Sequence, residues 1–333
     1  MSVILVLTHT RDDCASMVMD HLNNMGIESV RFDTDQFQKS IKLDMSLKEN
    51  GSVTGVYRFE THSLNFEDIG VVWNRRIHEP DLGNQFDSNP DIKDLILTES
   101  TWAMNLSFTM IKSTIVNPWE INEKLKFNKW VQMQRAAEMG FKIPISCLTS
   151  SSDMIKDFWD LTGKEMIFKK IRKGLLIKKD GKRILIHTSK IPESSFNDET
   201  ISRMRFYPMF LQKHINKKFD LRSVVVGNKV FTVVIHSQDI DIGKVDYRTA
   251  AVLGKLDEMK HEVVNLGEEI NNRLVDYVQS FGLSFGVVDS IITPDDEFIF
   301  LEINPNGQWA WLEHKTGLNI SQAFAEHLSN LNK

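Results

Sequence analysis

The chain has 333 residues, of which 41% are hydrophobic, so it can bury large cores and its length suggests two or three domains. A formal net charge of −5 and an isoelectric point near 6.1 argue against a nucleic-acid-binding protein. The apolar run at 3–7 is too short for a membrane span or a signal sequence, and the two cysteines, Cys14 and Cys147, have no metal-type spacing. We therefore expect a protein of the reducing cytoplasm that binds neither nucleic acid nor membrane.

The first third of the chain is expected to form a small α/β domain. A short apolar strand is followed by an amphipathic helix that Gly26 ends, and further strands surround a polar, hairpin-like stretch. The predicted elements are a strand at 3–7, a helix at 13–25, a strand at 28–34, a hairpin at 42–57, a strand at 70–76, a helix at 91–111 and a closing segment at 115–118. A strand–helix–strand opening is typical of a largely parallel sheet.

From residue 120 the pattern changes. A helix is predicted at 122–140, where Gly140 ends it, and a hairpin with a very basic centre at 165–188. From residue 207 the expected elements are three strands, a loop, a helix at 267–281, a closing hairpin at 286–309 and a last helix at 320–331. Because hairpins predominate after about residue 165, we expect α+β lobes in this part rather than one doubly wound sheet.

The closing hairpin carries the most informative side chains. Asp289 stands among apolar residues of its first run, whereas Glu302 and Asn304 are two residues apart on its second run and therefore share a face. Buried carboxylates need a compensating cation, and neither run contains Lys or Arg. Mg²⁺ takes a few protein oxygens and leaves its other positions to water and phosphates, so these three residues predict a magnesium site.

Basic side chains elsewhere suit an anionic ligand. Arg222 heads an apolar row, because Val224 and Val226 share its face of a predicted strand, and an arginine in such a place usually answers an anion. An intramolecular salt bridge is the competing explanation for this arginine. His236 ends the next strand, where a lone histidine is more often structural than a general base.

The order of these motifs resembles that of the ATP-grasp ligases. Before the Asp…Glu-x-Asn hairpin come Asn128-Lys129 on a helix, IFKK at 167–170, FLQKHI at 210–215 and DLR at 220–222. The resemblance implies the ATP-grasp fold, with a pre-ATP-grasp α/β domain at 1–118, a central lobe at 119–205 and a C-terminal lobe with the magnesium site at 206–333. It also implies ATP and Mg²⁺ as cofactors.

The resemblance assigns roles to single residues. Lys129 and Lys170 would approach the nucleotide phosphates, with Lys169 as the register alternative to Lys170. Asp220 would accept from the ribose or organise the nucleotide site, and Arg222 would face the phosphoryl group in transfer. Arg248 would be a second positive group, either for the phosphates or for the acidic substrate. A backbone segment between the lobes would read the adenine edge, and it consists of Gln212, Lys213, His214 and Ile215. The loop over the phosphates departs from the family, because it has only Gly174 and Gly181 amid lysines.

Two N-terminal blocks resemble the signature of one ATP-grasp branch, the microviridin-type peptide ligases or graspetide synthetases. The blocks are RFDTD at 31–35 and VWNRR at 72–76. This resemblance implies an ADP-forming ligase that activates Asp or Glu side chains of a ribosomal precursor peptide as acyl phosphates. Joining them to Thr or Ser hydroxyls or Lys amines would give macrocyclic esters or amides. What Asp33, Asp35, Arg75 and Arg76 do is open, and a domain-stabilising network is one explanation.

The same resemblance implies that a leader segment of the precursor docks on the central lobe. The sequence does not fix the oligomeric state, and a homodimer is a working assumption. From charge alone, the basic hairpin at 169–183 is a candidate surface for an acidic peptide. Two other functions stay open: an ATP-grasp ligase that adds a free amino acid to a peptide or protein carboxylate, and a nucleotide-binding scaffold without catalysis. An intact set of Asp289, Glu302, Asn304 and Arg222 argues against the scaffold.

Overall fold

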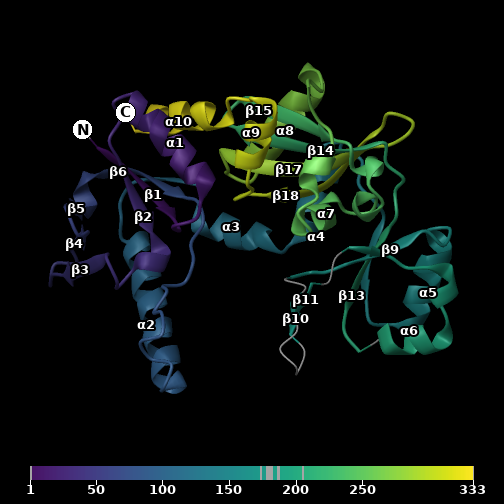
Figure 1. Ribbon diagram of the computed structural model, residues 1–333, viewed down its shortest axis with the longest axis horizontal. Coiled ribbons are helices and arrows are strands. Elements are labelled where there is room, and N and C mark those ends of the chain that lie inside the picture. Colours follow the sequence, from purple (N-terminus) through teal and green to yellow (C-terminus); the bar gives the residue numbers. More distant parts are fainter. Residues whose placement is uncertain (1, 173–174, 178–182, 186–187, 205, 333) are drawn as a thin grey trace.

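The computed structural model of the protein describes residues 2–332, except 173–174, 178–182, 186–187 and 205. Three units, each built around a sheet, follow one another along the chain (Figure 1). In the part of the chain that is described, no helix is both long and apolar enough to cross a membrane.

The N-terminal unit is built on a parallel sheet with the strand order β2-β1-β6-β7. Every residue of β1 is buried because both faces of the sheet are covered: Ile4 and Val6 pack with α1, whereas Leu5 and Leu7 pack with α2. The elements are β1 (Val3–Thr8), α1 (Asp13–Asn24), β2 (Ser29–Asp33), β6 (Ile69–Asn74), α2 (Pro90–Thr109) and β7 (Thr114–Val116). A small antiparallel sheet, β3 (Lys42–Leu47), β4 (Val53–Arg58) and β5 (Ser63–Asn65), lies between β2 and β6 in sequence. The predicted α/β domain is confirmed.

The middle unit holds an antiparallel sheet with the order β12-β9-β13-β8. Its helices and strands are α3 (Trp119–Lys126), α4 (Lys129–Glu138), β8 (Ser146–Thr149), α5 (Ser152–Leu161), β9 (Met166–Lys169), β12 (Ser189–Lys190), α6 (Asp198–Met204) and β13 (Met209–Lys213). Inside the predicted basic hairpin, β10 (Leu175–Ile177) pairs with β11 (Arg183–Leu185). Several residues of that prediction lie outside the described residues: Lys173, Gly174, Lys178, Lys179, Gly181 and Lys182.

One prediction for this unit is wrong. The expected single helix at 122–140 is broken between α3 and α4, because Asn128 acts as the N-cap of α4 and its side chain accepts from the Val131 N–H at 3.2 Å. Lys129 is therefore the first residue of α4 rather than a surface lysine in the middle of a helix.

The C-terminal unit is a five-stranded antiparallel sheet with the order β16-β15-β14-β17-β18. Its elements are β14 (Phe219–Val226), β15 (Lys229–Ile235), α7 (Tyr247–Val252), β16 (His261–Val264), α8 (Glu268–Gln279), β17 (Phe285–Ile292), β18 (Phe298–Asn304), α9 (Ala310–Thr316) and α10 (Ile320–Leu331). Short 3₁₀ turns at 34–36, 66–68, 193–195, 237–239, 241–243 and 256–258 complete the fold.

The last helix joins the two ends of the chain, since α10 returns to lie beside α1 of the N-terminal unit (Figure 1). Phe324 of α10 packs on Trp73 of β6 with ring centroids 4.5 Å apart, and both belong to a core that also includes Val224 and Phe285 of the C-terminal sheet. The N-terminal and C-terminal units therefore share one hydrophobic core.

A buried arginine strengthens this junction. The Arg75 side chain is fully buried, lies 3.2 Å from the Asp12 carboxylate and donates to the carbonyls of Asn306 and Gly307 at 2.8 and 2.9 Å. Its guanidinium also lies 4.7 Å from the ring centroid of Trp309. Arg75 thus ties the N-terminal sheet to the loop that leaves β18, which supports the expected domain-stabilising role.

We predict that Arg75→Met lowers the free energy of unfolding by about 3–5 kcal/mol, because the mutation leaves Asp12 buried without its cation. Arg58→Met, which removes an exposed ion pair with Asp44 in the same unit, is expected to change it by less than about 1 kcal/mol. Urea denaturation followed by circular dichroism measures both. Equal effects of the two mutations would contradict the role given to Arg75.

Candidate active site

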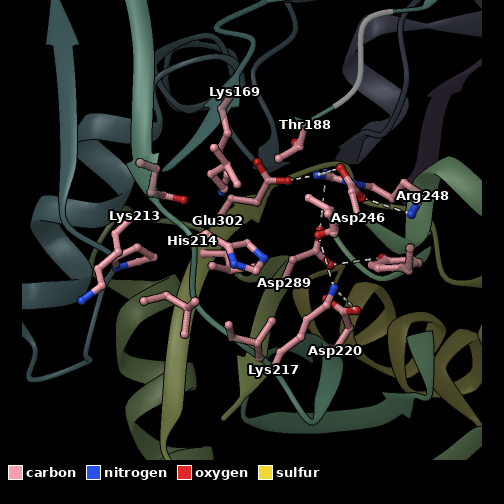
Figure 2. Close-up of a pocket in the computed structure, with 18 residues that line it drawn as sticks. Lys169, Thr188, Lys213, His214, Lys217, Asp220, Asp246, Arg248, Asp289 and Glu302 are labelled. Atoms are coloured by element: carbon pink, nitrogen blue, oxygen red, sulfur yellow. Dashed lines mark hydrogen bonds and ion pairs between the residues drawn. The ribbon is translucent and has the colours of Figure 1, made fainter. Parts of the chain in front are cut away.

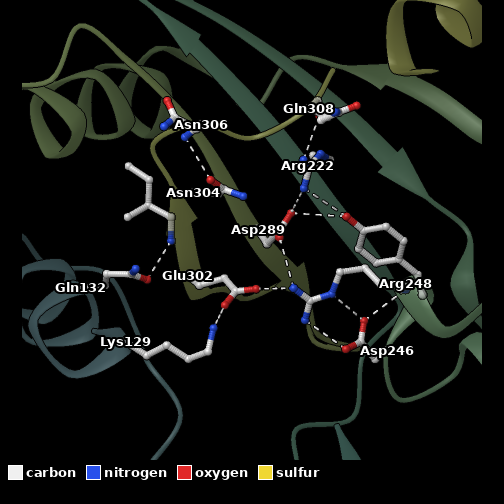
Figure 3. Close-up of polar contacts among 12 residues, drawn as sticks. Lys129, Gln132, Arg222, Asp246, Arg248, Asp289, Glu302, Asn304, Asn306 and Gln308 are labelled. Carbon is white, nitrogen blue, oxygen red and sulfur yellow. Dashed lines mark hydrogen bonds and ion pairs between the residues drawn. The ribbon is translucent and has the colours of Figure 1, made fainter. Parts of the chain in front are cut away.

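The predicted metal residues lie together on β17 and β18. Asp289 is paired directly with Glu302 in the ladder, and Asn304 lies opposite Val287 (Figure 3). Ile303 packs into the core between the sheet and α8, so its neighbours Glu302 and Asn304 face the other way, as the alternation predicts. A β-bulge follows Asp289 and changes the register beyond this pair.

The carboxylates are compensated by cations from other elements, which the hairpin sequence alone cannot reveal. Arg222 stands opposite Asp289 in the β14–β17 ladder, and its Nη1 donates to Asp289 Oδ1 at 2.7 Å. Glu302 receives Lys129 from the start of α4 on one oxygen and Arg248 on the other. The salt bridge that was the competing explanation for Arg222 is therefore present, with Asp289 as its partner.

Arg248 is held by a helix where the sequence predicted a loop. Asp246 is the N-cap of α7, and it also accepts from Arg248 Nε and Nη2 at 2.8 and 3.0 Å. Burial alone would raise the pKa of Asp246, but the Arg248 guanidinium more than offsets this and holds it well below its usual range. The Nη1 atom of Arg248 lies between the two carboxylates, in contact with Glu302 and 3.9 Å from Asp289 Oδ2.

A cleft of about 630 Å³, measured up to its open mouth, lies between the middle and C-terminal sheets. Most of the predicted site residues line it (Figure 2), namely Gln212, Lys213, His214, Ile215, Asp220, Arg248, Asp289 and Glu302. Lys129, Lys170, Arg222 and Asn304 are not part of its lining. Lys129 and Arg222 border the cleft through their ion pairs with Glu302 and Asp289.

Of the two candidate lysines at the end of β9, the structure favours the register alternative, Lys169. Ile167 and Lys169 line the cleft, whereas Phe168 packs into the core of the middle unit. Lys170 comes just after the end of β9 and is absent from the lining. Lys169 is the better candidate for the phosphates.

The cationic end of the cleft is short of negative charge. Burial, followed by the charges of Lys129 and Arg248, lowers the pKa of Lys169 to about 7. Burial and the Arg248 charge likewise lower the pKa of Lys129 to about 8, although the charges of Asp289 and Asp246 work in the other direction. No carboxylate of the described residues lies within ion-pair distance of Lys169.

In the segment between the lobes, at 212–215, one backbone N–H has no backbone acceptor among the described residues. The N–H groups of Lys213 and His214 donate to the carbonyls of Ile145 and Glu165 at 2.9 and 2.8 Å. The Ile215 N–H donates to no backbone carbonyl of the described residues, so it is the nearest free peptide donor for a ligand edge. Asp220 accepts from Lys217 Nζ at 2.6 Å, and both side chains are nearly fully buried. Burial raises the pKa of Asp220 despite this partner.

Sequence reasoning gave no role to Lys217, Asp246 and Tyr247, which are among the residues that line the cleft. The pattern Asp-x-Arg at 246–248, with an N-cap residue two places before an arginine, could have indicated a short capped helix. Lys217 carried no such signal, because its pairing with Asp220 depends on the turn into β14. Tyr247 donates to Asp289 Oδ1 at 3.4 Å and became visible only in three dimensions.

The oxygen-bearing side chains fit a magnesium ion in type. In the described chain, no three His, Cys, Asp or Glu side chains are grouped to hold a metal by themselves. Two facing carboxylates and one amide are the incomplete protein share that Mg²⁺ accepts when phosphates supply the rest. Arg248 lies between these carboxylates, so a divalent cation and this guanidinium compete for the same two groups.

Comparisons with known proteins agree with this geometry. A family model described as the RimK-like ATP-grasp domain matches residues 127–328. The chain belongs to this ATP-grasp family. A second model, described as the MvdD pre-ATP grasp domain, matches residues 3–123 of this ATP-grasp protein, which confirms the predicted fold. No curated protein sequence matches the chain.

Solved structures resemble the ATP-grasp protein over its whole length. One is a RiPP-associated ATP-grasp ligase of Chryseobacterium gregarium in complex with ADP and a leader and core peptide, with TM-score 0.90, 26% identity and coverage of 99% of this chain and 97% of that one. Another is the macrocyclase MdnC of Microcystis aeruginosa MRC bound with precursor peptide MdnA, with TM-score 0.84, 26% identity and coverage of 98% and 99%. The macrocyclase MdnB of the same organism has TM-score 0.76 at 26% identity and the same coverage.

We predict that the affinity for ADP falls as the pH rises through about 7, because Lys169 loses its proton there in the free protein whereas bound phosphate favours the charged form. One linked proton changes the Kd by up to about tenfold per pH unit above that pKa. Calorimetric titration of ADP at several pH values measures this, and Lys169→Arg should flatten the profile because the guanidinium stays charged. A wild-type profile as flat as that of the variant would contradict the assignment.

Proposed function

We propose that this protein is an ATP-dependent, ADP-forming ligase that cross-links a ribosomally made precursor peptide. It would activate Asp or Glu side chains as acyl phosphates and join them to Thr or Ser hydroxyls or Lys amines. The observation that carries the proposal is the whole-chain likeness to peptide-bound ligases at TM-scores of 0.90 and 0.84, combined with the facing pair Asp289 and Glu302 at a cationic cleft. Because the sequence identities are 26%, the precursors and ring patterns of these neighbours are not carried over to this chain.

In the proposed reaction the substrate carboxylate attacks the terminal phosphorus of ATP, and ADP leaves. The hydroxyl or amine then attacks the acyl carbon, loses its proton and releases phosphate. Lys169 and Lys129 would neutralise the phosphates, and the backbone around Ile215 would receive the adenine. Arg222 and Arg248 would stabilise the charge that develops on the phosphoryl group.

The residues Asp289, Glu302 and Asn304 would hold Mg²⁺. Bound there, the ion would neutralise negative charge on the phosphates. Arg248 is half-exposed at the start of α7, and it would provide positive charge to the phosphate oxygens when the carboxylates hold the ion. Arg222 is buried between β14 and β17, donates to the Gln308 carbonyl at 2.8 Å and stays with Asp289.

The leader of the precursor would dock on the middle unit. A hollow beside α3, α4 and β8 exposes apolar side chains, since Trp130, Leu148 and Ile171 are each more than two-fifths exposed. The prediction that the basic hairpin attracts an acidic peptide rests mainly on lysines outside the described residues. A cytoplasmic location, a homodimer and the domain limits at 118 and 205 stay predictions of the same proposal.

The function is tested by intact-mass analysis of a precursor peptide encoded beside this gene, after incubation with the protein, ATP and Mg²⁺. The proposal expects the loss of one water per bond, with ADP released in step. An unchanged peptide mass, with ADP formed only when free amino acids are added, would support the amino-acid ligase instead. No reaction in either assay would support the non-catalytic scaffold.

We predict that Glu302→Gln lowers the rate of condensation by about 10²–10³-fold, as is typical for the loss of one preorganised charge in an active site. Arg222→Ala should abolish detectable product, but its buried bridge to Asp289 makes the fold sensitive to this change. Arg222→Lys is the control that retains a cation. Turnover close to wild type in Glu302→Gln, with the fold verified by circular dichroism, would refute the site assignment.

We further predict that Leu148→Ser weakens binding of the precursor at least several-fold while the Kd of ADP is unchanged, because Leu148 lies in the hollow of the middle unit and outside the nucleotide cleft. Fluorescence anisotropy with labelled precursor measures this. Met154→Ser is the matched control, as Met154 is 48% exposed against 46% for Leu148 but lies on α5 outside the hollow. If the two variants bind alike, the leader docks elsewhere.

A further inference from the structure

The N-terminal unit has a second place where a ligand is expected. Strand β1 lies between β2 and β6, so the chain crosses to one side of β1 and later to the other. In open α/β sheets, ligands bind outside the carboxyl ends of the strands at such a switch point. His9 directly follows β1, and Arg75 and Arg76 directly follow β6. The backbone N–H groups of Arg75 and Arg76 both donate to the Leu7 carbonyl at 3.1 Å, which fixes the backbone of the two arginines beside β1.

His9 offers an unused hydrogen-bond donor at this point. The side chain is buried, with the residue only 7% exposed, and its ring stacks on His78 at 4.0 Å. The Arg11 N–H donates to His9 Nδ1 at 3.2 Å, so Nδ1 carries no proton and the proton of the neutral ring is assigned to Nε2. Nε2 is buried and has no hydrogen-bond partner among the described residues.

Arg76 offers an unused positive charge. Its side chain is partly buried, and within the described ranges it makes no hydrogen bond and has no carboxylate at ion-pair distance. The nearby acids are already engaged: Asp12 with Arg75 and Thr8, Asp33 with Arg31, and Asp35 with Thr10. Burial lowers the pKa of Arg76, so its charge is partly desolvated without an ion-pair partner. Such a perturbed, unpaired charge is common where a charge is kept for a ligand.

We propose that His9 and Arg76 form a subsite that binds a carboxylate of the acidic substrate peptide, an inference that rests on the proposed function. His9 is neutral in the assigned form, so Arg76 brings the single charge of this pair of side chains, which matches one carboxylate better than a doubly charged phosphate. The subsite is separate from the nucleotide cleft, whose lining contains neither residue. Arg75 connects the two, because it contacts the loop that follows Asn304.

The anion site is tested without any peptide by NMR of the whole protein with ¹³C-labelled histidine. Titration with acetate should shift the His9 ring resonance saturably in the wild type, and Arg76→Gln should weaken this binding at least about tenfold, the effect of losing a hydrogen bond to a charged group. Arg58→Gln, a paired arginine on the β3–β4 hairpin, is the matched control. No saturable shift with acetate, or a response to phosphate alone, would overturn the proposal.

The peptide arm uses the condensation assay with precursors in which single Asp or Glu residues are replaced by Asn or Gln. Arg76→Gln should lower kcat/KM at least about tenfold with the Kd of ADP unchanged, and this loss should vanish for the one precursor that lacks the bound carboxylate. An equal loss for every precursor would overturn the assignment to a peptide carboxylate. Failure of the wild type to condense any peptide, with acetate binding intact, would refute the proposed function and leave the anion site.

Stability separates this subsite from a structural role. Arg76 has no partner to lose, so Arg76→Gln should leave the Tm equal to or above that of the wild type. A lower Tm would mean that Arg76 stabilises the domain, as Arg75 does, and would contradict the subsite.

Discussion

The pairing of Asp289 and Glu302 with three cations is the interaction on which the rest of the site depends. Three carboxylates, those of Asp246, Asp289 and Glu302, meet the charges of Lys129, Arg222 and Arg248, so this network is balanced without a ligand. Lys169 remains outside the balance. A nucleotide that brings several negative charges therefore needs a cation with it, and the two carboxylates are where that cation is held.

Each of the three cations in this network comes from a different element. Lys129 begins α4, Arg222 lies on β14, and Arg248 lies on α7 beyond β15. The two arginines differ in exposure, because Arg222 is buried in the sheet whereas the Arg248 side chain is 47% exposed. The half-exposed Arg248 is bound by Asp246 and Glu302, while the buried Arg222 keeps Asp289 in place.

The sequence predicted those parts of the site that depend on local periodicity. Alternation along 297–304 placed Glu302 and Asn304 on one face, and the last helix was predicted with its observed bounds, 320–331. Predictions were poorer where one residue or one cap decides. Asn128 breaks a helix that periodicity alone would continue, and Lys169 rather than Lys170 faces the cleft because a strand inverts its face at each residue. The partners of Asp289 and Glu302 are distant in sequence, so no local pattern could reveal them.

The N-terminal unit contributes to the site through one loop. Asn117 donates to the Pro305 carbonyl at 2.6 Å, and Arg75 donates to the next two carbonyls, of Asn306 and Gly307. The Asn306 N–H in turn donates to Asn304 Oδ1 at 3.0 Å. The position of the third predicted metal residue is thus coupled to the ends of β6 and β7, which lie beside the proposed carboxylate subsite.

The most direct measurement of the central claim is electron paramagnetic resonance of Mn²⁺, used in place of Mg²⁺, titrated into the protein with and without ADP. If the carboxylates are balanced by Arg222, Arg248 and Lys129 until the nucleotide arrives, Mn²⁺ should bind weakly alone and much more tightly with ADP, and Glu302→Gln should remove the difference. Equal Mn²⁺ affinity with and without ADP, or binding that persists unchanged in Glu302→Gln, would contradict the account.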